Sequence, residues 1–372
     1  MNSDFLQILS DFLNAKSFEG LISDEIVSLA RSHQVLPIIY YQTKNELLKN
    51  HYLQAISIYT QRKALLNQIT EAFSDIPFYT VKGVSVSQYY PVPQLRTMGD
   101  CDIIVHESDK EKAKEKLVSI GFRFIETKRD GAEWHFEKQG LDFELHHRLL
   151  YDEVVNSEEE KSFTDLAWEY VQGHELDVNF HFVFLIIHLK KHFLDRGVGI
   201  RQFLDLVLMS KNASLEPKII AAYLKQVGLE RFAGVCSALC FRWFQIALPV
   251  DTPNISDELY YSATDTILCN GVFGFDQSDN NNNGFLNRVD KYGKLGSILN
   301  KFFPSYDDCA GTIKYKWIKG KPYLMPILWI YRLFEFLFSG RIKEGFGHIS
   351  NVAKSDETIA ERNELLVSWG LR

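Results

Sequence analysis

Residues 95–105 read LRTMGDCDIIV, with two acidic residues directly before a short apolar run. The run 103–105 is β-branched and follows a glycine closely, so it predicts a β-strand. Side chains alternate between the two faces of a strand, and Asp100 and Asp102 should therefore point to the same side. Two neighbouring carboxylates repel each other, and a hard divalent cation neutralises them well. The pair is our first candidate metal site.

A glycine turn precedes this pair along the chain. Residues 78–81 read FYTV and predict a strand, which Lys82 and Gly83 follow directly. Ser85 is placed to cap a helix that would run to Tyr90. A glycine between strand and helix lets backbone N–H groups approach phosphate oxygens, and the dipole of the helix N-terminus favours the same anions. Lys82 adds positive charge, so the turn predicts a phosphate site.

A third acidic segment lies at residues 141–146, which read LDFELH. The alternation places the apolar residues on one face and Asp142, Glu144 and His146 on the other. A carboxylate from this strand, beside the aspartate pair, would complete a site for two metal ions. Either Asp142 or Glu144 could supply it on alternation alone, because both side chains point the same way.

The order of glycine turn, Asp-x-Asp strand and later acidic strand resembles the nucleotidyltransferase superfamily related to DNA polymerase beta. More narrowly, the chain resembles the uncharacterised bacterial nucleotidyltransferase family 5. The matching motifs are Lys82-Gly83, Tyr90-Pro91, Arg96, Gly99-Asp100-Cys101-Asp102 and Glu144-Leu145-His146, with weaker matches at His188-x-x-x-His192, 201–205 and 303–305. One departure is in the turn, where the superfamily usually has Gly-Gly or Gly-Ser and this chain has Val84 after Gly83.

The resemblance implies an enzyme that transfers a nucleoside monophosphate from a nucleoside triphosphate such as ATP to a hydroxyl group, and releases pyrophosphate. It implies that Asp100, Asp102 and Glu144 are catalytic and hold Mg²⁺ or Mn²⁺, with Glu144 preferred to Asp142 because it matches the third acidic motif. The residues implied in binding the nucleotide are Lys82, Gly83, Ser85 and Arg96. Arg96 could equally be a structural partner of the carboxylates. A catalytically degenerate nucleotide-binding or regulatory module on the same fold is the alternative.

The composition limits the choice of partner. The chain has 372 residues and a net charge of −7. Long nucleic acids need clustered Lys and Arg, so a small molecule or a protein hydroxyl is the expected acceptor. Five scattered cysteines without a C-x-x-C pair fit a reducing compartment, and residues 1–13 do not read as a signal peptide. We therefore expect a cytoplasmic protein.

The most apolar segment is 322–338, which contains Pro326, Arg332 and Glu335. A membrane-spanning helix needs about 20 mostly apolar residues, so no transmembrane segment is expected. We predict a buried helix here, with contact to a membrane surface as the alternative.

Periodicity divides the chain into three parts and predicts an α+β protein. Residues 1–75 predict an N-terminal helical segment, and 76–155 alternate strand and helix as a small mixed-sheet nucleotidyltransferase domain. Residues 156–372 predict a larger C-terminal helical region, without strands, that would form the walls around the base and the acceptor. Four consecutive asparagines at 280–283 predict a loop.

Two pairs of polar residues lie on predicted helices of the C-terminal region. His188 and His192 are four residues apart, and we expect hydrogen bonds in a core rather than a zinc site, since a third ligand is lacking. Arg201 and Asp205 have the same spacing, and we expect them to pair with each other.

Overall fold

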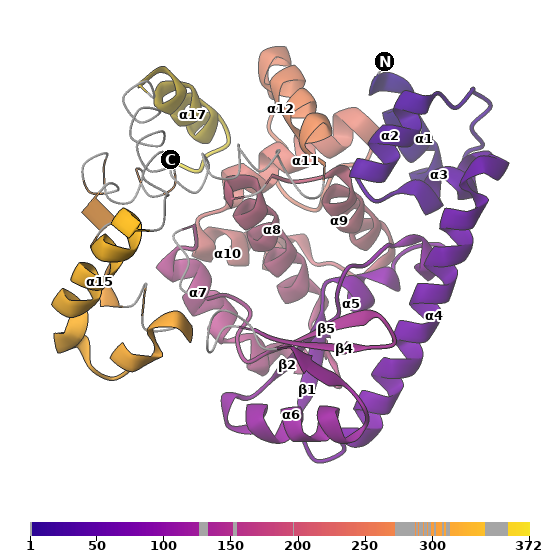
Figure 1. Cartoon of the computed structure of the whole chain (residues 1–372). Coiled ribbons are helices and arrows are strands. Elements are labelled where there is room, and N and C mark those ends of the chain that lie inside the picture. The colour runs from indigo at the N-terminus through magenta and orange to yellow at the C-terminus, as the bar shows by residue number, and fades with distance from the viewer. Residues whose placement is uncertain are drawn as a thin grey trace.

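The computed structural model describes residues 2–125, 133–151, 155–195, 197–271, 313–338 and 356–372, together with scattered positions between 287 and 309. The predicted loop at 280–283 lies outside the described residues. In Figure 1 the sheet occupies the lower half of the molecule, α4 and α6 flank it, and the helices α8 to α11 lie above it. This arrangement confirms an α+β protein in which helices flank a small mixed sheet.

Five strands form the mixed sheet in the order β1–β2–β5–β4–β3. The strands are β1 Phe78–Val81, β2 Asp102–Val105, β3 Arg123–Ile125, β4 Trp134–Lys138 and β5 Leu141–His146. Strand β2 runs antiparallel to β1 and parallel to β5, so the two acidic strands predicted from the sequence are neighbours at the centre of the sheet. Strands β4 and β5 form a hairpin through Gln139 and Gly140, which both have positive φ, as a tight hairpin turn requires.

Helices make up most of the remaining described chain. The α-helices are α1 Asn2–Leu13, α2 Asp24–Ser32, α3 Leu36–Thr43, α4 Lys49–Ala72, α5 Gly83–Ser87, α6 Lys110–Ser119, α7 Glu158–Asp165, α8 Val178–Asp195, α9 Ile200–Asn212, α10 Pro217–Val227, α11 Glu230–Phe244, α12 Asp257–Asn270, α15 Met325–Phe338 and α17 Asp356–Ser368. Short 3-10 turns are η1 Glu46–Leu48, η2 Pro93–Leu95, η3 Glu107–Asp109, η4 Ala167–Tyr170, η5 Ile313–Ile318 and η6 Pro322–Leu324.

Local sequence explains where several helices begin. The Ser23 hydroxyl accepts the Ile26 N–H at the start of α2, and Ser157 with Glu160 forms a capping box at the start of α7.

Two large apolar cores hold these elements together. One lies under the sheet, where α4 and α6 bury Leu65, Ile69 and Leu117 against Phe136 and Phe143. The other is continuous from the N-terminal helices to α8, α9, α11 and α12. Helix α1 packs on α11, and the Asn14 side-chain amide donates to the Phe244 carbonyl at 3.0 Å. The predicted division of the chain at residues 75 and 155 stays a prediction.

The structure corrects two expectations about the C-terminal region. A small hairpin, β6 Val171–Gln172 with β7 Glu175–Leu176, lies where no strand is predicted. This hairpin lies beside β1, the edge strand of the large sheet, because the His174 carbonyl accepts the Thr80 N–H of β1 at 2.9 Å. The two strands are too short to show a period of two in sequence.

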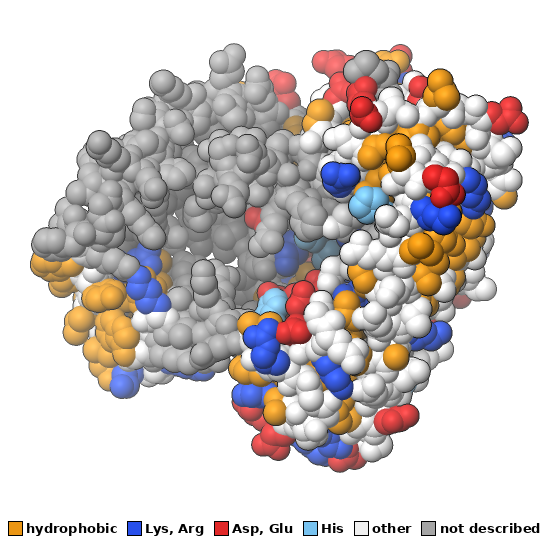
Figure 2. Space-filling model, turned by 45° about the vertical axis from the view of Figure 1, so that its right-hand side comes forward, with side chains coloured by type: hydrophobic (Ala, Val, Ile, Leu, Met, Phe, Trp, Pro, Cys, Tyr) orange, Lys and Arg blue, Asp and Glu red, His pale blue; other side chains and the backbone are white. Residues whose placement is uncertain are grey.

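Helix α15 is the second correction, because it is buried on one face only. Met325 and Leu328 are buried, whereas Ile327 and Ile330 are each 56% exposed. Figure 2 shows hydrophobic side chains gathered on the left of the molecule, where α15 lies in Figure 1. In the described part of the chain, no helix combines the length and apolarity needed to cross a membrane. Contact of the outer face with a membrane surface stays a prediction, which flotation with liposomes would test.

Candidate active site

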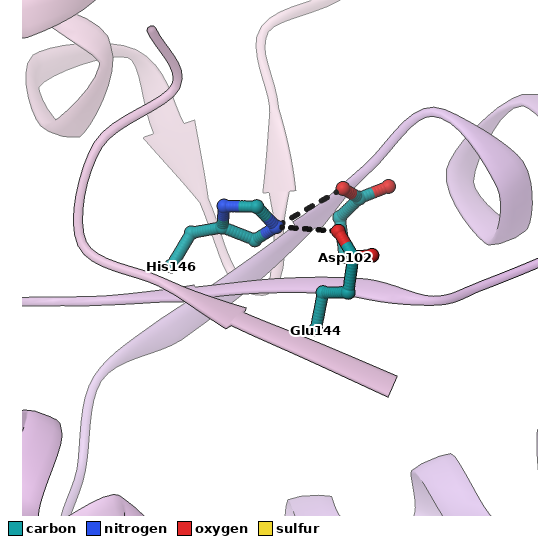
Figure 3. A group of neighbouring side chains, drawn as sticks. All are labelled: Asp102, Glu144 and His146. Atoms are coloured by element: carbon teal, nitrogen blue, oxygen red, sulfur yellow. Dashed lines mark hydrogen bonds and ion pairs between the residues drawn. The ribbon is translucent and has the colours of Figure 1, made fainter. Parts of the chain in front are cut away.

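Asp102 and Glu144 lie side by side at the centre of the sheet. They are register partners on the parallel strands β2 and β5. His146, two residues after Glu144 on the same face, brings its Nε2 to 3.3 Å from Asp102 Oδ1 and 3.2 Å from Glu144 Oε2 (Figure 3). The other oxygen of Glu144 is 3.5 Å from Nδ1 of His135, its partner on β4. The carboxylate chosen from the third acidic strand therefore faces Asp102.

Asp142 lies away from this group. Its register partner is Glu137 on β4, and it is exposed where Glu144 is half-buried. No hydrogen bond or ion pair joins it to Asp102 among the described residues. The geometry therefore distinguishes Glu144 from Asp142, which strand alternation alone could not do.

Lys82 supplies the positive charge of the site. Its backbone follows β1 with φ 55° and ψ −121°, a conformation that costs a residue with a Cβ about 1–3 kcal/mol. The Lys82 N–H donates to His181 Nε2 on α8 at 3.2 Å, and this bond holds the turn. Nζ then reaches Asp102 Oδ1 at 2.9 Å. The strained turn therefore aims the ammonium group at the buried carboxylate.

The charges of the site stabilise one another. Burial raises the pKa of Asp102, but Lys82 and His146 outweigh this effect and hold its pKa well below the usual range. Burial lowers the pKa of His146, but Asp102 and Glu144 outweigh it and raise the pKa to about 9. The pKa of Glu144 is raised by burial and lowered more by the hydrogen bond from His146, so this carboxylate is ionised at neutral pH.

Asp100 stands just before β2 on a loop that helices outside the sheet hold in place. Asp100 as a whole residue is exposed. Neighbouring atoms nevertheless remove solvent from its carboxylate, and this desolvation together with the negative charge of Asp102 raises its pKa. The Arg62 guanidinium of α4 donates to the carbonyls of Met98 and Gly99 at 3.1 and 3.0 Å. Arg201 of α9 donates to the Thr97 carbonyl at 3.0 Å. The loop is therefore anchored by helices that precede and follow the sheet in the sequence.

Gly83 opens the short helix α5 at a crowded position. A Cβ there would lie 3.1 Å from Met98 Sδ and 3.3 Å from Arg96 Nη1, closer than most side-chain contacts. Ser85 lies inside α5 and is buried, and its hydroxyl is 2.8 Å from that of Thr80. The expectation that Ser85 caps this helix is wrong, because α5 begins two residues earlier and Lys82 is its cap.

Arg96 is buried against α9. Its Nε and Nη2 donate to the two carboxylate oxygens of Asp205 at 3.0 and 2.8 Å, and the Tyr90 hydroxyl donates to the same carboxylate at 2.7 Å. The expected pair of Arg201 with Asp205 is therefore wrong. Arg96 binds Asp205 through two hydrogen bonds. Arg201 instead donates to the Thr97 carbonyl of the loop before β2.

His188 and His192 meet as expected, with their Nε2 atoms 3.2 Å apart. Burial lowers the pKa of His188 well below its usual value, so this histidine is neutral in the folded protein.

A small pocket lies at the site. It is lined by Lys82, Asp102 and His146 together with Arg148 and Phe184. Figure 2 shows acidic, basic and histidine side chains close together around a hollow of that face.

The site combines a small mixed sheet flanked by helices, a glycine turn after its first strand and carboxylates on the adjacent strands β2 and β5. The chain belongs to the family described as uncharacterised nucleotidyltransferase, whose family model matches residues 22–245. The match includes the whole sheet and all candidate site residues. Neither the comparison with curated proteins nor that with solved structures gave a match.

Several residues of the site's surroundings are missed by reasoning from the sequence. Arg62, His181 and Asp205 each reach the site region across 36 or more residues, and no local pattern marks such contacts. His146 differs, because its place on the polar face of the acidic strand is visible in the alternation. That signal identifies it as a neighbour of Glu144 but not as a partner of Asp102.

Proposed function

We propose that the protein transfers a nucleoside monophosphate from a nucleoside triphosphate to a hydroxyl group of a small molecule or a protein, and releases pyrophosphate. The observation that carries the proposal is the position of Asp102 and Glu144 on adjacent parallel strands, with the Lys82 ammonium group against Asp102. The net charge of −7 argues against a long nucleic acid as acceptor.

The site residues fit a divalent cation. Asp102, Glu144 and His146 each offer a ligand atom, and these atoms lie within 4.8 Å of one another. Loss of solvent around its carboxylate, and after it the negative charge of Asp102, raise the pKa of Asp100, and a cation beside the two carboxylates would relieve the second effect. Mg²⁺ or Mn²⁺, when bound, would stabilise the charge that develops on the transferred phosphoryl group and its leaving pyrophosphate.

The protein's own groups have distinct roles in this proposal. Glu144 is ionised at neutral pH and can accept the proton of the acceptor hydroxyl. The Lys82 ammonium group, released from Asp102, can bind the triphosphate. The Gly83 Cα faces Met98 and Arg96, so a phosphate contact at this residue would come from its backbone N–H. Ser85 supports this turn through Thr80.

Arg96 has little capacity left for a nucleotide. Two of its nitrogens are held by Asp205, and only Nη1, 3.4 Å from the Thr97 carbonyl, could face a phosphate. We therefore propose that Arg96 acts mainly by packing beside Gly83 and keeping the turn in position. Its contribution to nucleotide binding should be smaller than that of Lys82.

The test is a screen with labelled nucleoside triphosphates and Mg²⁺ or Mn²⁺ in cell extract, following which molecule acquires the label. The wild-type protein should transfer label and Asp102→Asn should not, while Asp142→Asn serves as a matched control on the same sheet. A triphosphate with Mg²⁺ should also raise the thermal stability of the wild-type protein. Stabilisation without any transfer would favour the degenerate nucleotide-binding module. Absence of both would reject the proposal.

A further inference from the structure

His146 offers a ligand atom in the proposed site but has no defined role there yet. Its side chain is 10% exposed, and its Nε2 points at Asp102 and Glu144 at the same time (Figure 3). The separations of 3.3 and 3.2 Å are close to those between adjacent ligands of one metal ion, which lie about 3 Å apart when each is about 2.1 Å from the ion. His146 Nε2 therefore lies at the spacing of an adjacent ligand from both carboxylates, and all three ligand atoms lie within 4.8 Å of one another.

The opposite side of the imidazole supports this orientation. His146 Nδ1 is 3.5 Å from the Tyr151 hydroxyl oxygen, at the long limit of a hydrogen bond. A histidine that binds a metal usually donates its other ring N–H to an oxygen, which fixes the ring and leaves the ligating nitrogen with its lone pair. Tyr151 is placed to accept from Nδ1, and Nε2 is then the nitrogen that faces the carboxylates.

We propose that His146 Nε2 is a direct ligand of the site's metal ion, beside Asp102 and Glu144, and that the site prefers Mn²⁺ or Co²⁺ to Mg²⁺. Imidazole nitrogen suits transition metal ions, whereas Mg²⁺ prefers an all-oxygen shell. Lys82 Nζ shares the Asp102 oxygen that faces His146, so the ammonium group would leave this oxygen when the ion binds. The Nε2 proton that bonds the two carboxylates would be released to solvent at the same time, since a ligating imidazole nitrogen must be deprotonated. The inference rests on the proposed function only in assuming that a metal ion binds.

The chain offers a matched control in His135. This histidine also contacts Glu144, with Nδ1 3.5 Å from Oε1, but it faces the outer oxygen and its side chain is 32% exposed. Within the described residues, no ion pair or hydrogen bond joins it to Asp102. Replacing His135 therefore removes an imidazole from Glu144 and leaves the contacts of His146 with Asp102 and Glu144 in place.

Pulsed electron paramagnetic resonance of the Mn²⁺-loaded protein tests the inference directly. We expect ¹⁴N coupling from a ligated imidazole in the wild-type protein and in His135→Gln, and its loss in His146→Gln. Bound Mn²⁺ without ¹⁴N coupling in the wild-type protein would overturn the inference, and so would coupling that persists in His146→Gln. If His146→Gln does not fold, as judged by thermal melting, the wild-type spectrum and the His135→Gln spectrum decide.

Metal competition gives a second measurement that does not depend on activity. Isothermal titration should show that His146→Gln lowers the ratio of Mn²⁺ to Mg²⁺ affinity by about tenfold or more, because an amide oxygen replaces the nitrogen. His135→Gln should keep the wild-type ratio. An unchanged ratio in folded His146→Gln would overturn the inference and leave the proposed function standing. A wild-type protein that binds neither ion would contradict the metal-dependent function as well.

Discussion

At the scale of single residues, the site is a buried aspartate compensated by two cationic groups. Asp102 is 3% exposed and contacts both Lys82 and His146. A buried carboxylate without partners would be very unfavourable, so these contacts keep it ionised in the protein as folded. A divalent ion carries the same charge as these two cationic groups together. It could therefore replace them in balancing the charge of Asp102.

The first prediction separates Glu144 from Asp142. Glu144→Gln should lower pyrophosphate release by about a thousandfold or more, because it removes a carboxylate that faces Asp102. Asp142→Asn should lower it by no more than about tenfold, since this residue is exposed and opposite Glu137. Rates are compared in folded variants with the same acceptor. The reverse ranking would place the third acidic motif at Asp142.

Strand alternation explains how much of the site can be predicted from the sequence. It places Asp102 and Glu144 on polar faces of short strands, whereas the expectation that they share one site comes from the family resemblance. It gives no information on Arg96, whose choice of Asp205 depends on how α9 packs against the sheet. Local periodicity therefore predicts on which strand face Asp102 and Glu144 lie. It does not predict which helix residues contact the site, because those contacts depend on tertiary packing.

At the scale of elements, the loop that carries Asp100 is held by helices from both sides of the sheet domain. Helix α4 contributes Arg62, and α9 contributes Arg201 together with the Asp205 that holds Arg96. These side chains bond the loop's carbonyls or its arginine, so the loop has little freedom of its own. The position of Asp100 thus depends on the packing of elements far away in sequence.

The second prediction concerns the buried pair of Arg96 and Asp205. Asp205→Asn should lower the free energy of unfolding by about 3–5 kcal/mol, because Arg96 is left as an uncompensated buried charge. The double variant Arg96→Met with Asp205→Leu should lose less than Asp205→Asn, because it removes both charges. Urea unfolding measures each value. Equal losses in the two variants would show that the charge pair does not determine stability here.

At the scale of the whole molecule, one histidine links three helices that lie far apart in the sequence. His33, at the end of α2, accepts the Ile200 N–H of α9 with Nδ1 at 3.1 Å and donates through Nε2 to the Leu268 carbonyl of α12 at 3.1 Å. Burial lowers its pKa from 6.5 to about 4, although the hydrogen bond to Leu268 opposes the shift. The folded protein therefore keeps His33 neutral.

The third prediction follows from this shift. The unfolded state takes up a proton more readily than the folded state between pH 6.5 and 4, so stability is full above 6.5 and falls as the pH is lowered. The loss from His33 should approach about 3 kcal/mol near pH 4. Urea unfolding between pH 7.5 and 4.5 should show a shallower pH slope for His33→Asn than for the wild type. Parallel curves would contradict this role.

The fourth prediction tests the continuous helical core. Ile8→Ala in α1 should lower the free energy of unfolding by about 2–5 kcal/mol, because Ile8 is fully buried. Amide hydrogen exchange should then speed up in α11 as well as in α1, since the two helices share this core. Asp4→Ala, on the exposed side of α1, is the control. Unchanged protection in α11 would instead support an N-terminal segment that is stable by itself.

The packing of α1 on α11 also has a consequence for the chain as it is made on the ribosome. The two residues that join these helices, Asn14 and Phe244, are 230 positions apart. At about 5–20 residues per second, the first helix waits roughly 10 to 50 s before its partner has been synthesised. During that interval α1 can pack on α2 and α3, but the part of its apolar side that α11 covers in the folded protein is available to chaperones. The nascent sheet, whose strands all lie within residues 78–146, has no such delay.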